Sequence, residues 1–159
     1  MNKNWFRSVR ELDDDQKAFI KLPPHGRYSL VGPPGSGKTN LLLLRAEFLA
    51  GTGEKNVLIL TYTRALADFI KTGIGAAGLI SPKQIRTLHS WAPEHIFQHL
   101  GQRAIKKGTD FDDDARSEML ALVKEANSRL PTPKLYSAIF VDEAQDLTSD
   151  ELAALLCLS

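Results

Sequence analysis

The chain has 159 residues with 43% hydrophobic and 25% charged side chains, a composition typical of one soluble globular domain with a single core. Its formal net charge of +1 excludes a chain that is strongly basic or acidic throughout, so any nucleic-acid surface must be a local patch. The single cysteine, Cys157, excludes an internal disulfide, and the absence of a long apolar run predicts a cytoplasmic protein with no membrane partner.

Segments with helical patterns alternate along the chain with short apolar runs of strand length. In chain order, the predicted elements are a helix over residues 13–20, a strand over 27–31, a helix over 38–50, a strand over 56–61, a helix over 64–71, a short strand over 84–88, helices over 90–100 and 112–129, a strand over 138–141 and a helix over 148–156. Because the strands are continuous apolar runs, helices are expected to cover both of their faces. This order predicts the α/β class, with a parallel sheet and crossover helices.

A glycine-rich turn lies between the first predicted strand and the second predicted helix. It consists of Gly32, Pro33, Pro34, Gly35, Ser36, Gly37, Lys38 and Thr39. Gly35 and Gly37 permit positive φ angles and a close approach to an anion, and the start of the next helix adds roughly half a positive charge. Lys38 is expected to reach the β- and γ-phosphates, and the Thr39 hydroxyl to bind Mg²⁺. The turn therefore predicts a phosphate-binding loop for a nucleoside triphosphate.

Two adjacent carboxylates follow the last predicted strand. Asp142 and Glu143 come directly after the apolar run Ala138–Val141. Parallel sheets bind ligands at the carboxyl ends of their strands, so both side chains are expected near the phosphate loop. Asp142 is predicted to hold Mg²⁺ together with Thr39, directly or indirectly, and Glu143 to polarise or deprotonate an attacking water. The pair indicates hydrolysis in addition to binding.

An ordered set of short motifs extends over residues 12–147. The set consists of Gln16, Gly32–Thr39, Thr61-Tyr62-Thr63, Thr87-Leu88-His89-Ser90 and Asp142-Glu143-Ala144-Gln145-Asp146. In this order it resembles the superfamily 1 helicases of the UvrD/Rep type. The resemblance implies a RecA-like P-loop NTPase domain that binds ATP with Mg²⁺ and contacts single-stranded DNA. The sequence does not distinguish DNA from RNA.

The resemblance also implies roles for individual residues. Gln16 matches the family glutamine whose amide reads the adenine edge, and Asn40 stands where the family often has an arginine that holds the nucleotide. The implied catalytic residues are Lys38, Glu143 and Gln145, with Gln145 coupling the nucleotide site to the nucleic-acid track. The implied nucleic-acid contacts are Thr61, Tyr62, Thr63, Arg64, Thr87, His89 and Ser90. Among them, Tyr62 is expected to stack on a base.

The chain departs from this family in its length. A short spacer separates His89 from Asp142, where the family commonly inserts a subdomain, and the chain stops at Ser159, before the family's second RecA-like domain and arginine finger. Weak hydrolysis and no unwinding are therefore expected of residues 1–159 alone. The next family strand, which usually lies between the phosphate-loop strand and the strand before Asp142, is also absent, so we expect either a gap in the sheet or a changed strand order. The leucines of the last helix expected to lack partners are Leu152, Leu155 and Leu156.

These departures make residues 1–159 a partial RecA-like domain, with missing helicase domains or a complementing chain as expected partners. Two other functions fit parts of the sequence. A free-standing P-loop ATPase or kinase would share the loop, but a cluster of arginines typical of a substrate lid is not present. A nucleotide- or DNA-binding regulatory module would share the motifs without needing Glu143. Phosphate contacts by Arg86, Arg103, Lys106 and Lys107 are an open alternative to a solvated charged face.

Overall fold

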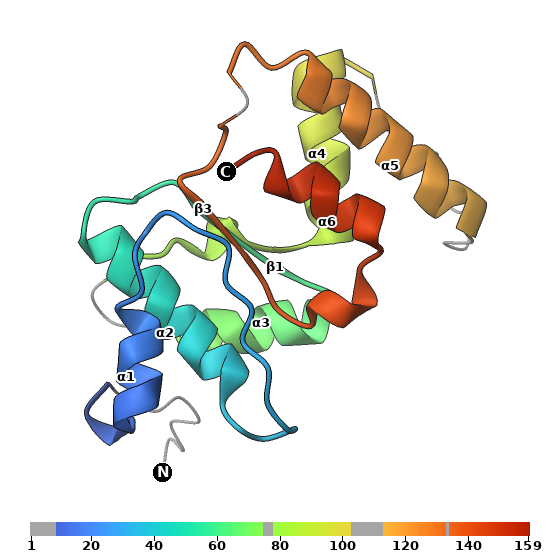
Figure 1. Ribbon diagram of the computed structural model, residues 1–159. Helices are drawn as coiled ribbons and strands as arrows, with labels where there is room; N and C mark the ends of the chain where they lie inside the picture. Colours follow the sequence, from blue (N-terminus) through green and yellow to red (C-terminus); the bar gives the residue numbers. More distant parts are fainter. Residues whose placement is uncertain (1–8, 75–77, 103–112, 133) are drawn as a thin grey trace.

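The computed structural model describes residues 9–74, 78–102, 113–132 and 134–159 of the chain (Figure 1). Its helices are α1 (Asp14–Ile20), α2 (Lys38–Gly51), α3 (Arg64–Thr72), α4 (Leu88–Leu100), α5 (Asp113–Ser128) and α6 (Ser149–Leu156), with short 3-10 helices η1 (Val9–Glu11), η2 (Pro82–Gln84) and η3 (Ala144–Asp146). Its strands are β1 (Val57–Thr61), β2 (Ile85–Thr87) and β3 (Ala138–Val141). The expected helix start at Asp112 and the basic residues Arg103, Lys106 and Lys107 lie outside the described residues.

The three strands form one parallel sheet in the order β2-β1-β3 (Figure 1). Thr61 at the end of β1 pairs with Thr87 at the end of β2, and Leu60 pairs with Val141 at the end of β3. The carboxyl ends of the strands therefore meet at one edge of the sheet, which brings the residues that follow them together. The predicted α/β class, with a parallel sheet flanked by helices, is confirmed.

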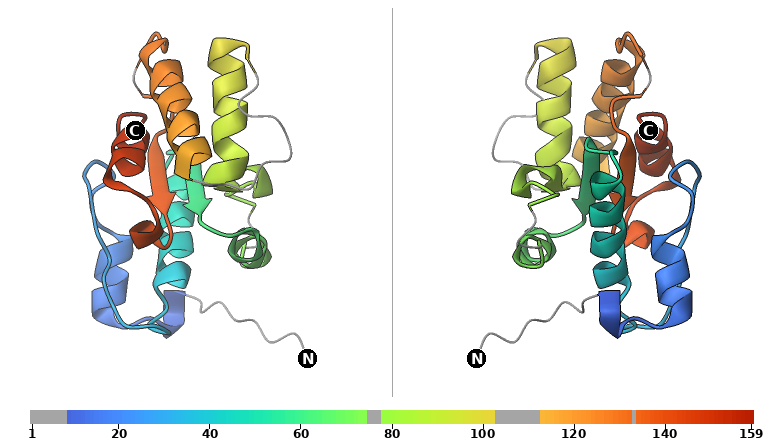
Figure 2. Two further views of the ribbon diagram at one scale, coloured as in Figure 1. Left: turned by 90° about the vertical axis from the view of Figure 1, so that its right-hand side faces the viewer. Right: turned by 90° about the vertical axis from the view of Figure 1, so that its left-hand side faces the viewer.

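β1 forms the centre of the core because its side chains alternate between two helical layers. Val57 and Ile59 pack with buried residues of α2 and α3, whereas Leu58 and Leu60 pack with buried residues of α4, α5 and α6. The whole of β1 is buried, as expected for a continuous apolar strand in a parallel sheet. α4 and α5 lie side by side in both views of Figure 2.

Among the described helices, none combines the length and the apolar character needed to cross a membrane.

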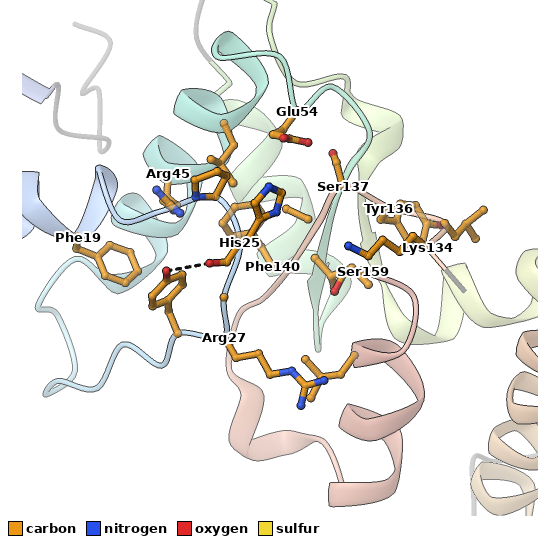
Figure 3. A pocket seen from close by; sticks show the side chains of 18 residues that line it. Phe19, His25, Arg27, Arg45, Glu54, Lys134, Tyr136, Ser137, Phe140 and Ser159 are labelled. Carbon is orange, nitrogen blue, oxygen red and sulfur yellow. Dashed lines mark hydrogen bonds between the residues drawn. The ribbon is translucent and has the colours of Figure 1, made fainter. Parts of the chain in front are cut away.

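The strand predicted over residues 27–31 is not formed. The segment is extended, but it does not pair with any strand of the described sheet, and Val31 is 88% exposed. A cleft of about 640 Å³ is lined by Arg27 and Tyr28 of this segment and by Ala138–Phe140 of β3. An extended segment without a neighbour lacks the ladder of hydrogen bonds that defines a strand, whatever its side chains. The described sheet therefore ends at β3, and the cleft lies between this edge strand and residues 26–28 (Figure 3).

The last helix is better packed than predicted. Leu155 is 2% exposed in the core shared with α4 and α5, so the expectation that it lacks a partner is wrong. Leu158 is also buried, and its carbonyl oxygen accepts two backbone hydrogen bonds from the segment before β3. Leu152 is half-buried, and Leu156 remains 38% exposed as expected. Leu155 in α6 and Leu158 after it are thus part of the core, while Leu156 lines the cleft beside β3.

Candidate functional site

The phosphate loop joins the extended segment to α2 and turns at two glycines. Gly35 and Gly37 have φ angles of 78° and 84°, and a Cβ atom at either position would meet no atom within 4 Å. The main chain is therefore open to an approaching anion, whereas an L-residue would be strained there. Lys38 begins α2, and its Nζ donates hydrogen bonds to the carbonyl oxygens of Gly32 (2.9 Å) and Pro33 (3.0 Å). These neutral acceptors bind a cation less strongly than a phosphate oxygen does.

Thr39 and Asp142 join the two halves of the site. The Thr39 hydroxyl donates a hydrogen bond to Asp142 Oδ2 at 2.9 Å, although the two residues are 103 positions apart. The first turn of α2 supplies the hydroxyl, and the residue after β3 supplies the carboxylate. Hydroxyl and carboxylate oxygens are ligands that Mg²⁺ prefers. The pair therefore has the donor chemistry of the predicted metal site.

Asp142 is a buried carboxylate with 7% of its surface exposed. Burial raises its pKa above the ordinary value, and the charge of Glu143 acts in the same direction. The hydrogen bond from Thr39 and the charge of Lys38 lower the pKa, but by less. Because a cation would neutralise this costly buried charge, the environment of Asp142 favours metal binding.

Replacement of Asp142 by asparagine is expected to stabilise the fold at neutral pH. Folding raises the pKa of Asp142, so ionisation of this carboxyl group costs more in the folded protein than in the unfolded chain. The free energy of unfolding therefore falls as the pH rises from about 3.9, the pKa in the unfolded chain, through the higher pKa in the folded protein. Asparagine keeps an oxygen that accepts from Thr39 but carries no charge, and its amide nitrogen cannot accept from the Glu143 N–H, a loss that is the same at every pH. The free energy of unfolding of Asp142→Asn, relative to the parent, should therefore increase between these two pKa values and then stay constant. Urea unfolding of both proteins in Mg²⁺-free buffer over about pH 4–8 measures this difference.

The control for this experiment is Asp146→Asn, which removes an exposed carboxylate of the same segment. Its effect on the free energy of unfolding is expected to be small, because the Asp146 side chain is not buried. An advantage of Asp142→Asn that does not increase with pH would contradict the assignment of a costly buried charge.

Glu143 has a backbone conformation that residues other than glycine rarely adopt. Its φ and ψ angles are 54° and 48°, in the left-handed region, which costs an L-residue roughly 1–2 kcal/mol. In this conformation its N–H donates to Asp142 Oδ1 at 3.2 Å, and Gln145 Nε2 donates to its Oε2. Glu143 is thus in contact with Asp142 through its backbone N–H and with Gln145 through its carboxylate. The strained residue is the one predicted to activate water, and such strain is often found at functional sites.

Gln16 lies beside the phosphate loop, as predicted, and has a second role. A pocket of about 330 Å³ is lined by Leu12, Gln16, Gly35, Ser36, Gly37, Asn40 and Leu41. The Asp13 N–H donates to Gln16 Oε1 (3.2 Å), and the Gln16 N–H donates to Asp13 Oδ1 (2.8 Å), forming a capping box that starts α1. The aspartate–glutamine spacing in the sequence was a signal for this cap. The amide nitrogen of Gln16 takes no part in the box, so adenine recognition stays a prediction.

Two aromatic rings meet at the carboxyl ends of β1 and β2. Tyr62 follows β1 and is 40% exposed, and its ring meets the His89 ring edge-on with 6.4 Å between centroids. Burial and the charge of Arg116 lower the pKa of His89, and Glu151 opposes them weakly. Arg64, the first residue of α3, follows two positions after Tyr62 and is exposed. The structure thus brings together Tyr62 and His89, two of the residues predicted to contact nucleic acid.

The hydroxyl groups predicted to contact nucleic acid already have backbone partners. Thr61 is buried and donates to the Thr63 carbonyl at 2.9 Å, while the Thr63 side chain caps α3. Thr87 and Ser90 form the capping box of α4. Each hydroxyl therefore has a structural role that the sequence-based assignment did not include. Contact of these four residues with a phosphate stays a prediction.

Arg116 of α5 has a role near the site that the sequence did not indicate. Its Nε donates to Glu151 Oε1 at 2.7 Å, and its Nη2 donates to Glu151 Oε2 at 2.5 Å and to the Asp146 carbonyl at 2.9 Å. Burial raises the pKa of Glu151, but hydrogen bonds from Arg116 and from the Thr148 backbone lower it by more, so the net pKa is below its ordinary value. The predicted capping box of Thr148 and Glu151 is confirmed. Arg116 therefore ties α5 and α6 to the segment that carries Glu143 and Gln145.

Comparisons with known proteins agree with this fold and this loop. A family model described as an AAA domain matches residues 15–158, a range that contains the phosphate loop, all three strands and the residues from Gln16 to Gln145 discussed above. A search of curated proteins found no match, and neither did a search of solved structures. The match extends over nearly the whole chain and agrees with the glycine-rich turn at the start of α2. This chain therefore belongs to the AAA domain family, whose members are nucleotide-binding ATPases.

Proposed function

We propose that the chain is the ATP-binding part of an ATP-dependent DNA helicase or translocase of the superfamily 1 type, and that it binds Mg-ATP and single-stranded DNA. The proposal is supported by two sets of side chains at one edge of the sheet. Thr39 and Asp142 are in contact at the end of β3, and Tyr62 and His89 are in contact after β1 and β2. A nucleotide and a nucleic acid would therefore bind at the same edge of the sheet, where binding of one can change the affinity for the other.

On the nucleotide side, residues of the chain bind the phosphates and position the attacking water. Lys38 exchanges its carbonyl partners for phosphate oxygens, which are stronger acceptors. Thr39 and Asp142 are the residues that would hold Mg²⁺, which neutralises phosphate charge when it is bound. Glu143 accepts a proton from the attacking water, and Gln145 orients the Glu143 carboxylate through the hydrogen bond it donates.

On the nucleic-acid side, Tyr62 offers an exposed ring on which a base stacks. Stacking does not depend on base identity, which suits a protein that moves along a strand of any sequence. The edge contact with His89 fixes the orientation of the Tyr62 ring. Because the pKa of His89 is lowered, its imidazole is uncharged at pH 7 and packs as a neutral aromatic ring. Arg64 adds a cation for a backbone phosphate.

Replacing Tyr62 by alanine is expected to weaken binding of single-stranded DNA by about 5- to 150-fold. The estimate follows from the roughly 1–3 kcal/mol that base–aromatic stacking contributes per base. Fluorescence anisotropy with a labelled oligothymidine at low salt, with and without Mg-ATP, measures the change. The same titration with oligouridine distinguishes DNA from RNA.

The matched control is Phe97→Ala, which removes a 53% exposed ring from the second half of α4, away from this edge. Its DNA affinity should equal that of the parent. Equal losses in both variants would contradict a stacking role for Tyr62. ATP binding by a parent protein that does not bind DNA or RNA would instead favour a nucleotide-binding regulatory module.

A further inference from the structure

α1 packs on α2, apart from the main core. Leu12, just before α1, and Ile20, at its end, meet Leu41 of α2 in a small apolar cluster that is separate from the two clusters around β1. Among the described elements, α1 makes its main contacts with α2. A helix as short as Asp14–Ile20 is not stable by itself in water, so its contacts with α2 decide where it lies.

Arg45 ties the end of α1 to the middle of α2 (Figure 3). The residue is 4% exposed, and its guanidinium donates to the carbonyl oxygens of Ile20 (2.6 Å), Leu22 (2.5 Å) and Pro23 (2.7 Å). Carbonyl groups at the end of a helix lack partners within it and carry partial negative charge, which a cation complements. Burial lowers the pKa of Arg45, because a buried charge is costly unless it is hydrogen-bonded. One planar group thus holds three carbonyls, and with them the end of α1, in one arrangement.

One face of α2 leads from Arg45 to the phosphate loop. Lys38, Leu41 and Arg45 are spaced by three and four residues, which places them on the same side of the helix. Lys38 belongs to the loop, and Leu41 lines the pocket of about 330 Å³ beside it. Leu12 and Gln16 line this pocket from the α1 side. The position of α1 on α2 therefore sets how far Gln16 lies from the phosphate loop.

We propose that Arg45 is a positioning residue for recognition of the nucleotide base. Arg45 does not line the pocket itself, but by fixing α1 it holds Leu12 and Gln16 as the wall on which the base lies. The capping box with Asp13 fixes the Gln16 amide relative to α1, so the amide moves only if the helix moves. The inference rests on nucleotide binding at the phosphate loop, which is part of the proposed function. Loss of Arg45 should remove the affinity that the base contributes and leave the affinity for the phosphates.

The test compares ATP with inorganic tripolyphosphate, both with Mg²⁺, by calorimetry on residues 1–159. Tripolyphosphate has the phosphate chain of ATP but lacks the base and the sugar. In Arg45→Met, ATP should bind at least about tenfold more weakly, whereas the affinity for tripolyphosphate should change by less than about twofold. A general loss of folded protein would instead lower the number of binding sites for both ligands alike.

A double variant shows whether Arg45 acts through α1. Gln16→Ala alone should weaken the binding of ATP but not of tripolyphosphate. Added to Arg45→Met, it should cause less than about twofold further loss, because α1 no longer holds this side chain at the base. If the two losses multiply instead, Arg45 and Gln16 act independently, and the proposal is overturned.

Two further variants complete the test. Arg45→Lys keeps the charge, but an ammonium group cannot reproduce the planar fork of a guanidinium. It should show the same selective loss of ATP affinity at a smaller size, at least about threefold, and it carries the test if Arg45→Met does not fold. Arg129→Met removes an arginine after α5 whose side chain is 58% exposed, and it should bind both ligands as the parent does.

The outcomes separate this proposal from the proposed function. Equal weakening of ATP and tripolyphosphate in the Arg45 variants, or no change in either, overturns the positioning role and leaves the nucleotide site in place. A parent protein that binds ATP no more tightly than tripolyphosphate does not recognise the base, which also overturns the positioning role. A parent that binds neither ligand contradicts the proposed function itself, and the positioning role with it.

Discussion

Replacing Lys38 by alanine is expected to weaken Mg-ATP binding about 30- to 4,000-fold. The Lys38 ammonium group lies inside the loop, 2.9 Å and 3.0 Å from the carbonyl oxygens of Gly32 and Pro33, where a phosphate would meet it. Removing one partner of a desolvated charge pair costs roughly 2–5 kcal/mol, and each 1.4 kcal/mol is a factor of about ten. Isothermal titration calorimetry of ATP, with and without Mg²⁺, measures the loss.

The matched control is Lys83→Ala, an exposed lysine in η2 at the amino end of β2, opposite the edge that carries the site. Its ATP affinity should equal that of the parent protein. If Lys38→Ala binds ATP as the parent does while remaining folded, the assignment of the phosphate loop is wrong. If the parent binds ATP equally with and without Mg²⁺, the metal role of Thr39 and Asp142 is wrong.

Short-range patterns specified most of this fold. The continuous apolar run of β1 indicated a strand buried on both faces, and all of it is buried between two helical layers. The spacing of Thr148 and Glu151 indicated the cap of α6. Thr39 and Asp142, 103 positions apart, were expected near each other because parallel strands share one carboxyl edge. This general rule allowed two residues that are far apart in the sequence to be assigned to one site.

Features that depend on distant partners were not predictable from the sequence. The segment over residues 27–31 has strand-like side chains, but without a neighbouring strand it makes no ladder. Leu155 was expected to lack partners, yet α4 and α5 bury it. The left-handed backbone of Glu143 is accompanied by a contact with Asp142. A glutamate in the sequence does not indicate a left-handed backbone conformation. Arg116 meets Glu151 across 35 positions, so no local spacing marks the pair.

Replacing Arg116 by methionine is expected to destabilise the fold by roughly 3 kcal/mol, since it leaves the Glu151 carboxylate, 3% exposed, without its cation. This value is at the lower end of the range for breaking a buried ion pair, because the Arg116 side chain is itself 28% exposed. The pKa of Glu151 is lowered in the folded protein, so its stabilisation is present above the unfolded pKa of about 4.3 and is lost as the pH falls through the lowered value. The difference between variant and parent should therefore be largest near neutral pH, as urea unfolding measures.

Lys124→Met is the matched control. Lys124 and Asp150 also join α5 to α6, at 2.7 Å, but their side chains are 49% and 68% exposed, so the expected loss is about 0–1 kcal/mol. Equal losses in the two variants would contradict the view that burial makes the Arg116 pair important.

Adding Glu151→Leu to Arg116→Met provides a second criterion. Because the instability comes from an uncompensated buried charge, removing that charge should recover a large part of the lost stability, whereas a purely steric effect of methionine would leave the double variant no more stable.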